Sequence, residues 1–481
     1  MLVGKPADRK HDAIVVGAGP NGLAAAIVLA RAGLAVHVVE AREQPGGGCR
    51  TSALLRPDVL HDDCSSVHPL GVASPVFRDF GLERFGLAWI QPPAALAHVL
   101  PDGSAVTLER SVAETAAQLG GDADAYTSLL AEHVARFDAL APAVLAPLRW
   151  PAHPLALARF GLTALRSMRG LARATFSEAA APALLAGIAA HAMLPLDAPA
   201  TAAIALLLGA AGHAVGWPLA RGGSAAITRA LLRCLEEHGG TLELGHEVRS
   251  LDELPAARAY VLDVTPRQLV RLAGPKLPAR YQERLGGFRY GPGVCKLDWV
   301  LSAPVPWRDL RCARAATVHL SGRLDDIAAA EAAVHQGRLA DEPFVLLVQP
   351  TLFDPTRAPA GVHVAWAYCH VPHGSPADAT ARIEAHVERH APGFRDAIVA
   401  RSVRTAVDME RYNPNYVGGD INGGLSSLGQ LFTRPLVQRD PYRTAAPDVF
   451  LCSSSTPPGG GVHGMCGAWA ARSVLRDVFG R

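Results

Sequence analysis

The sequence predicts an α/β protein with a Rossmann-type parallel sheet, and three observations near its start carry this prediction. Residues 12–16 form a short apolar run that is typical of a buried strand. Residues 20–32 are rich in alanine and leucine and are expected to form a helix. Residues 35–40 return to a β-branched pattern, so the three segments together make a βαβ unit that opens a parallel sheet.

Composition narrows the class of protein. The chain has 481 residues, of which 49% are hydrophobic and 19% are charged. These values exclude an intrinsically disordered chain, a collagen and a disulfide-stapled mini-domain, and they allow a large core. The formal net charge of +2 gives no electrostatic reason to expect nucleic acid as a partner. The eight cysteines form no CxxC pair, so neither a zinc site nor thioredoxin-type redox chemistry is predicted, and no metal is expected.

Two segments bear on cellular location. Residues 1–10 are polar and charged, and we expect a short disordered leader there. No signal-peptide pattern follows, so a reduced cytoplasmic protein is expected. Residues 198–220 carry no formally charged side chain and are long enough to span a bilayer. The prolines and glycines in and around this segment favour a buried helix and loop instead.

A glycine fingerprint follows the first predicted strand. In the run from Gly17 through Gly19 to Gly22, the first glycine allows a tight turn and the second lets backbone approach a pyrophosphate. The third lets the helix pack close to the strand. Pro20 and Asn21 open the helix, whose N-terminus offers unpaired amides and a partial positive charge to phosphates. This context predicts a dinucleotide site.

A carboxylate at the end of the second strand indicates which dinucleotide is bound. Glu40 can accept hydrogen bonds from both ribose hydroxyls and would repel a 2′-phosphate, so NADP is not expected. Ala41 and Arg42, which follow directly, are assigned to the same site.

The glycine run at residues 46–50 selects among dinucleotides. The amides of Gly47 and Gly48, together with the Arg50 guanidinium, suit a second contact to the pyrophosphate. NAD enzymes do not need this element, whereas FAD enzymes of the glutathione-reductase-like class do. FAD is therefore the predicted cofactor.

A second glycine-rich segment lies close to the C-terminus. Residues 449–452 are expected to form a strand that leads into a polar loop, and a helix is expected over 464–478. We assign Gly460, Gly461, Val462 and His463 of this loop to the flavin. A helix N-terminus directed at the pyrimidine edge would stabilise the negative charge of the reduced flavin.

These motifs together resemble the phytoene desaturase and carotenoid isomerase branch of the flavin amine oxidase superfamily. The likeness covers nearly the whole chain, and it is carried by Gly-Pro-Asn-Gly at 19–22 and by the segments at 46–50, 221–223, 247–248, 290–294, 413–416 and 418–424. The resemblance implies a non-covalent FAD and backbone hydrogen bonds from Val248 to the adenine. No CxxxxC redox disulfide is present, so disulfide reduction is not expected.

The resemblance also implies how the chain is divided. An α+β substrate domain would be inserted into the FAD-binding domain. We expect the FAD-binding domain to comprise residues 1–75, 221–270 and 403–481. The substrate domain would then comprise residues 76–220 and 271–402.

Two residues are candidates for catalysis. Along the strand predicted at 293–301, Lys296 and Asp298 share one face by the period of two. The segment is similar to the strand whose lysine holds a water against the reactive flavin nitrogen in amine oxidases. A salt bridge from Lys296 to Asp298 or another carboxylate is the alternative. His463 stands where carotenoid desaturases usually have proline, and it could contact the pyrimidine carbonyl or the substrate, or be a structural histidine.

The predicted activity is hydride transfer from a carbon of an apolar organic substrate to the flavin. The alternatives are an amine (C–N) oxidase that uses oxygen and a non-catalytic, FAD-loaded interaction protein.

Residues 139–177 contain no acidic residue, and Arg166, Arg169 and Arg173 fall on one helical face. This pattern predicts weak peripheral contact with an anionic membrane at the mouth of the substrate cavity; a surface helix with solvated arginines is the alternative.

Overall fold

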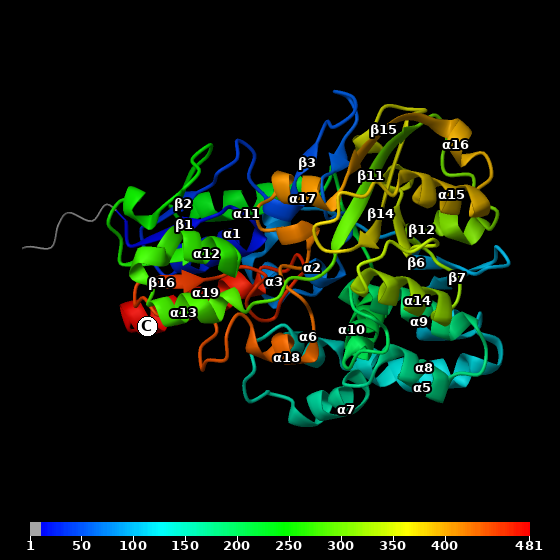
Figure 1. The fold of residues 1–481 in the computed structure, drawn as a ribbon, viewed down its shortest axis with the longest axis horizontal. Coiled ribbons are helices and arrows are strands. Elements are labelled where there is room, and N and C mark those ends of the chain that lie inside the picture. The colour runs from blue at the N-terminus through cyan, green and yellow to red at the C-terminus, as the bar shows by residue number, and fades with distance from the viewer. Residues whose placement is uncertain (1–10) are drawn as a thin grey trace, which may run out of the picture.

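The computed structural model describes residues 11–481, so the leader expected at residues 1–10 lies outside the described residues. Figure 1 shows two regions, each organised around its own sheet. The N- and C-terminal segments lie in one region together with residues 225–286, and most of the rest of the chain forms the other region.

The first region contains the predicted parallel sheet. It has five strands in the order β16-β10-β1-β2-β9, and each neighbouring pair is parallel. The strands are β1 (Ala13–Val16), β2 (Val36–Val39), β9 (Thr241–Glu243), β10 (Ala259–Leu262) and β16 (Val449–Leu451). The prediction of a Rossmann-type α/β fold is confirmed.

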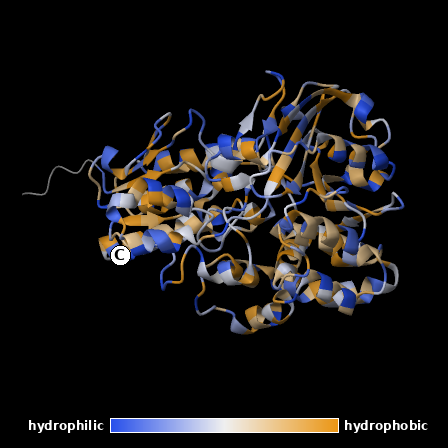
Figure 2. Cartoon of the chain, in the orientation of Figure 1, coloured by the Kyte–Doolittle hydropathy of each residue, from blue (hydrophilic) through white to orange (hydrophobic). Residues whose placement is uncertain are grey.

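Helices cover both faces of this sheet, which explains why its strands are apolar on both sides. Ala13 and Val15 pack against α1 (Pro20–Arg31), α11 (Ala225–Glu237) and α19 (Met465–Phe479). Ile14 and Val16 face the other way, toward α12 (Pro266–Ala273) and α13 (Ala279–Gly286). In Figure 2 the strands accordingly carry mostly hydrophobic colour.

The second region contains a mixed sheet of seven strands, in the order β15-β11-β14-β13-β12-β6-β7. Only the β12–β6 pair is parallel among these neighbours. The strands are β6 (Ala94–Val99), β7 (Ala105–Leu108), β11 (Gly293–Leu301), β12 (Ala315–Leu320), β13 (Val345–Val348), β14 (His363–Val371) and β15 (Ile398–Arg404). Two short two-stranded sheets join β3 (Thr51–Ser52) to β4 (His61–Asp62) and β5 (Trp89–Ile90) to β8 (Leu219–Ala220).

A layer of helices packs against one face of the seven-stranded sheet and lies below it in Figure 1. Its members are α4 (Val112–Ala116), α5 (Ala123–Ala135), α6 (Phe137–Val144), α7 (Pro154–Ala164), α8 (Met168–Thr175), α9 (Ala180–Ala189) and α10 (Thr201–Ala214). The remaining α-helices are α2 (Pro69–Ala73), α3 (Pro75–Phe80), α14 (Leu324–His335), α15 (Thr380–His390), α16 (Phe394–Ala397), α17 (Ala406–Tyr412) and α18 (Leu428–Thr433).

The expected domain division differs from the observed packing at its edges. Val76, Phe77 and Phe80, which we assigned to the substrate domain, pack into the core around the parallel sheet. Leu277 and Leu285 do the same on its other face. The boundary at 403 also falls inside β15, which belongs to the seven-stranded sheet.

The segment carrying the predicted basic helix is not one helix. α7 ends at Ala164 and α8 begins at Met168, with the Ser167 hydroxyl accepting the Gly170 amide as an N-cap. Arg166 therefore lies between two helices and does not share a helical face with Arg169 and Arg173. In the apolar segment at 198–220, α10 has 14 residues. Over residues 11–481 we find no helix that is both long enough and apolar enough to cross a bilayer.

Candidate active site

One cavity of about 600 Å³ connects the two regions, a volume typical of small-molecule and cofactor sites. Its lining starts at the carboxyl ends of β1 and β2, with Val16 and Val39. The lining continues along α10 and reaches β13 at Leu346 and β14 at Trp366. The cavity therefore has an end in the parallel sheet and an end beneath the seven-stranded sheet.

The glycine fingerprint forms the turn between β1 and α1, as predicted. Gly17 has a φ of +102°, a backbone conformation that favours glycine. A Cβ at Gly22 would lie 2.0 Å from the Gly17 carbonyl oxygen, so only glycine lets α1 approach the strand this closely. The N-cap residue of α1, Gly19, has no side chain with which to cap the helix.

Most of the predicted cofactor residues line this cavity. They are Gly17, Gly19, Pro20, Asn21, Glu40, Ala41, Arg42, Gly47, Gly48, Arg50, Val248, Gly460, Gly461 and Val462. The structure therefore brings together segments from both ends of the chain. Gly22 and His463 are not part of the lining, and neither is Lys296.

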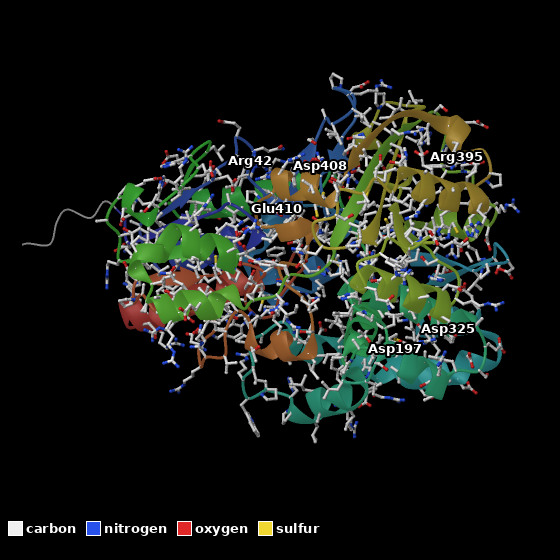
Figure 3. All side chains as sticks on the ribbon, in the orientation of Figure 1. Arg42, Asp197, Asp325, Arg395, Asp408 and Glu410 are labelled. Atoms are coloured by element: carbon white, nitrogen blue, oxygen red, sulfur yellow. The ribbon has the colours of Figure 1, made fainter. Side chains whose placement is uncertain are left out.

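Glu40 is held in place by its own loop. Its carboxylate accepts the Ala18 amide at 2.8 Å and the Arg42 amide at 3.0 Å, and it lies 3.3 Å from Arg50 Nη2. The Arg42 side chain points away toward α17, where it donates to the carbonyl oxygens of Arg411 and Tyr412 (Figure 3). A carboxylate fixed in this way can accept ribose hydroxyls without first being ordered.

His463 lies directly behind the glycine loop. It is fully buried, its Nδ1 accepts the Met465 amide at 3.1 Å, and its Nε2 has no partner among the described residues. Burial lowers the pKa of His463 to about 4, so the imidazole is neutral at physiological pH. These contacts show a histidine that shapes the start of α19, and its catalytic role stays a prediction.

Asp263 is a residue of the site that sequence reasoning missed. It follows β10 and accepts the Gly22 amide at 2.9 Å, and a Cβ at Gly19 would lie 2.7 Å from its Oδ2. Burial, together with the charge of Glu40, raises the pKa of Asp263 to about 7. Its position at the carboxyl end of a third parallel strand was the available signal.

The far end of the cavity is mainly apolar. One face at the start of α10 lines this end, with residues at helical spacing: 200, 203, 204, 207 and 208. The other apolar and aromatic lining residues include Val67, Leu70, Met193, Leu194, Trp217, Leu346, Trp366 and Tyr368. The carboxylates in the lining, Glu40, Glu247 and Asp263, all lie at the dinucleotide end.

Histidines provide polar atoms at this apolar end. His191 lines the cavity, and its Nε2 lies 3.2 Å from the Nε2 of the fully buried His319. Burial lowers the pKa of His191 to about 4 and that of His319 well below its ordinary value. Both imidazoles are therefore neutral at physiological pH, and each can accept or donate a proton.

Lys296 lies behind the cavity wall. Its ammonium contacts Asp298 Oδ1 at 2.5 Å and sits 4.9 Å from the ring centroid of Trp366, which lines the cavity. Burial opposes ionisation of Asp298, but the Lys296 charge and the His61 contact hold its pKa below the ordinary value. The alternative pairing of Lys296 with Asp298 is thus the contact observed, and the flavin role stays a prediction.

The comparisons with known proteins agree with this geometry. Residues 15–80 match the family described as NAD(P)-binding Rossmann-like domain. The rat (Rattus norvegicus) pyridine nucleotide-disulfide oxidoreductase domain-containing protein 2 is 27% identical over 98% of this chain and 94% of its own. Hydroxyneurosporene desaturase of Rhodobacter capsulatus is 40% identical over 20% of each chain. Cyclohexylamine oxidase from Brevibacterium oxydans superposes with a TM-score of 0.60 at 16% identity, covering 98% of this chain and all of its own.

These likenesses fit the flavin amine oxidase superfamily that the sequence resembles. The relatives and the Rossmann-like domain support an FAD-binding oxidoreductase, and the residues present fit that cofactor. The buried Asn21 Oδ1 lines the cavity without a partner among the described residues. Gly19 and Gly47 approach each other so closely that a Cβ on Gly47 would lie 3.2 Å from the Gly19 Cα. All eight cysteines lie in the described part of the chain and are unpaired.

Glu40→Ala is expected to weaken FAD binding by this protein. Charge-assisted hydrogen bonds to a ribose contribute about 1.5–3 kcal/mol, which corresponds to about 10–100-fold in Kd. Titration of the apoprotein with FAD, followed by flavin fluorescence, measures this change. Glu247→Ala is the matched control, because Glu247 also lines the cavity but is half-exposed and faces Arg271. Equal affinity in the Glu40 variant and the wild type would contradict the ribose assignment.

Proposed function

We propose that this FAD-dependent oxidoreductase removes a hydride from a carbon of an apolar organic substrate and leaves a desaturated product. The observation that carries the proposal is the far end of the cavity, which one face of α10 and the aromatic side chains of β14 enclose. Such a lining desolvates hydrocarbon and excludes water from the reacting carbon. The local similarity to a desaturase supports the same class of substrate.

The chain's own residues position the substrate and handle the proton. Bound FAD supplies the two-electron acceptor. Desaturation releases one hydride to that acceptor and one proton from the neighbouring carbon. His191 is a neutral imidazole in the lining and can accept this proton, and His319 behind it can share the charge through the contact between their Nε2 atoms.

An amine substrate is the second candidate, and the likeness to cyclohexylamine oxidase is the observation that favours it. Trp366 and Tyr368 both line the cavity with ring centroids 5.9 Å apart and planes 19° apart. They make a continuous aromatic wall that could contact an amine. Against this candidate, the described lining has no carboxylate at the far end to pair with an ammonium group.

Anaerobic mixing tests the proposal. We expect hydrophobic alkenes that fit the cavity to bleach the flavin absorbance band, and we expect NADH and NADPH to leave it unchanged on the same timescale. The reason is that the chain has one dinucleotide fingerprint, which is assigned to FAD. Rapid reduction by either nicotinamide would contradict the proposal.

The same experiment separates the alternatives. Bleaching by primary amines but not by alkenes would make the protein an amine oxidase. Retained FAD with no reduction across a broad panel of both classes would instead support the non-catalytic interaction protein. His191→Phe should slow reduction by any alkene that works without changing FAD content, because it removes the proton acceptor and leaves the dinucleotide end intact.

A further inference from the structure

Exposed apolar side chains are concentrated on one small part of the molecule. Five of the ten large hydrophobic residues that the described chain exposes lie between residues 148 and 165. We call them the α7 surface: Leu148, Trp150, Leu155, Leu162 and Leu165, which are 82%, 87%, 75%, 80% and 52% exposed. Large exposed apolar side chains gathered in one segment are typical of a protein or membrane contact site.

The exposure does not come from a poorly packed helix. Ala156, Phe160 and Ala164 recur every fourth residue and are buried, so α7 has a defined inner face. Leu155 and Leu162 lie seven residues apart on the outer face. In Figure 1, α7 lies at the lower edge of the molecule, away from the parallel sheet. The helix is thus fixed to the protein and presents leucine outward.

Arginines without carboxylate partners flank this surface. Arg149 lies over the Trp469 ring at 4.4 Å, and Arg166 donates to the Gly170 carbonyl oxygen. In residues 11–481 neither forms an ion pair with a carboxylate. Arg159, on the helix itself, pairs with Glu132. The apolar group therefore has an unpaired positive charge near each end.

Two of the basic residues that the sequence suggested for membrane contact form ion pairs within the protein instead. Arg169 pairs with both Asp197 and Asp325, and Arg173 pairs with Asp325. Figure 3 shows the two aspartates close together beside α8. These ion pairs join α8 to α14, so the two arginines are not free to contact an anionic partner.

The α7 surface is directly connected to the wall of the cavity. The carbonyl oxygen of Leu165 accepts the Ala200 amide at 3.0 Å, and that of Arg166 accepts the Ala202 amide at 3.3 Å. Ala200 and Ala203 line the cavity. The exposed leucine and the cavity lining are therefore separated by a single backbone hydrogen bond.

From these observations we infer that the α7 surface inserts into the interfacial layer of an anionic lipid membrane. The leucines and Trp150 would enter the boundary between headgroups and acyl chains, as apolar helix faces do. Arg149 and Arg166 would contact lipid phosphates, where each arginine adds attraction that salt weakens. The inference does not depend on the reaction that the cavity supports.

Vesicle co-sedimentation of the FAD-loaded protein tests the inference. We expect binding to phosphatidylglycerol vesicles at low salt and weaker binding at high salt. The triple variant Trp150→Gln, Leu155→Gln, Leu162→Gln should bind about tenfold more weakly, a change that corresponds to about 1.4 kcal/mol. The matched control is Leu310→Gln, Val399→Thr, Val437→Gln, which removes three exposed hydrophobic residues elsewhere and should bind like the wild type.

Iodide quenching of the wild type keeps the test valid if a variant folds poorly. Of the seven tryptophans, Trp150 alone is exposed, so it dominates quenching in solution. Vesicles should protect it. Unchanged quenching, or equal sedimentation of the two triple variants, would overturn the inference. So would light scattering that shows a lipid-free wild-type dimer and a monomeric Trp150, Leu155, Leu162 variant, because a second copy would then cover the surface.

Discussion

Lys296→Met is expected to lower the free energy of unfolding by about 3–5 kcal/mol, the usual effect of breaking a buried ion pair on one side. Lys296 and Asp298 are 2% and 1% exposed, and their charged atoms lie 2.5 Å apart. Methionine keeps most of the volume but leaves the Asp298 carboxylate without its cation. His61, at 3.5 Å, remains as its ion-pair partner among the described residues. Urea denaturation of the FAD-loaded protein measures the change.

A double variant separates stability from chemistry. Lys296→Met with Asp298→Leu removes both charges, and we expect most of the lost stability to return. We also expect reduced flavin in this variant to be reoxidised by oxygen at nearly the wild-type rate, because the ammonium lies behind Trp366. A large loss of oxygen reactivity in the stable double variant would instead support the flavin role that the resemblance implied for Lys296.

Gly22→Ala is expected to destabilise the protein by about 3 kcal/mol, at the upper end of overpacking effects, and to abolish most FAD binding. The added Cβ would lie 2.0 Å from the Gly17 carbonyl oxygen and 3.2 Å from the Asp263 Cβ. The turn and the start of α1 must then separate, which displaces the amides that face the dinucleotide. FAD content after purification and the midpoint of thermal unfolding measure the two effects.

Gly161→Ala is the control for this variant. Gly161 lies inside α7, and a Cβ there would meet no atom within 4 Å. Since alanine favours helix over glycine by about 1 kcal/mol, this substitution should stabilise the protein slightly and leave FAD content unchanged. Similar behaviour of the two variants would show that close packing at Gly22 is not what the site requires.

The dinucleotide end was predictable because its residues are close in sequence. Gly17, Gly22 and Glu40 fall within one βαβ unit, and spacing alone fixes their places around the strand ends. Asp263 was not found in this way. It reaches the same turn from β10, 241 residues beyond Gly22, so its place in the site depends on which strands are neighbours in the sheet.

The far end of the cavity was less predictable for a related reason. β6 reads Ala-Ala-Leu-Ala-His-Val and is buried throughout, so its composition resembles the alanine-rich helices around it. Such a composition favours a helix, and tertiary pairing with β7 and β12 makes the segment a strand. His191 and His319 are 128 residues apart and meet only through this packing.

The basic helix predicted around residues 166–173 also depends on contacts between residues that are far apart in the sequence. The arginine spacing was read correctly as helical between Arg169 and Arg173, but Asp325 lies more than 150 residues away and neutralises both. The Ser167 N-cap, which was visible in the sequence, would have placed a helix start before Met168.

Cofactor analysis of the purified protein tests the central claim most directly. The claim is that one cavity holds FAD at the parallel sheet and an apolar substrate at α10. Denaturation followed by chromatography should release intact, non-covalent FAD at one equivalent per chain. A supernatant that contains a nicotinamide dinucleotide, or no nucleotide even after incubation of the protein with excess FAD, would contradict the assignment of the cavity.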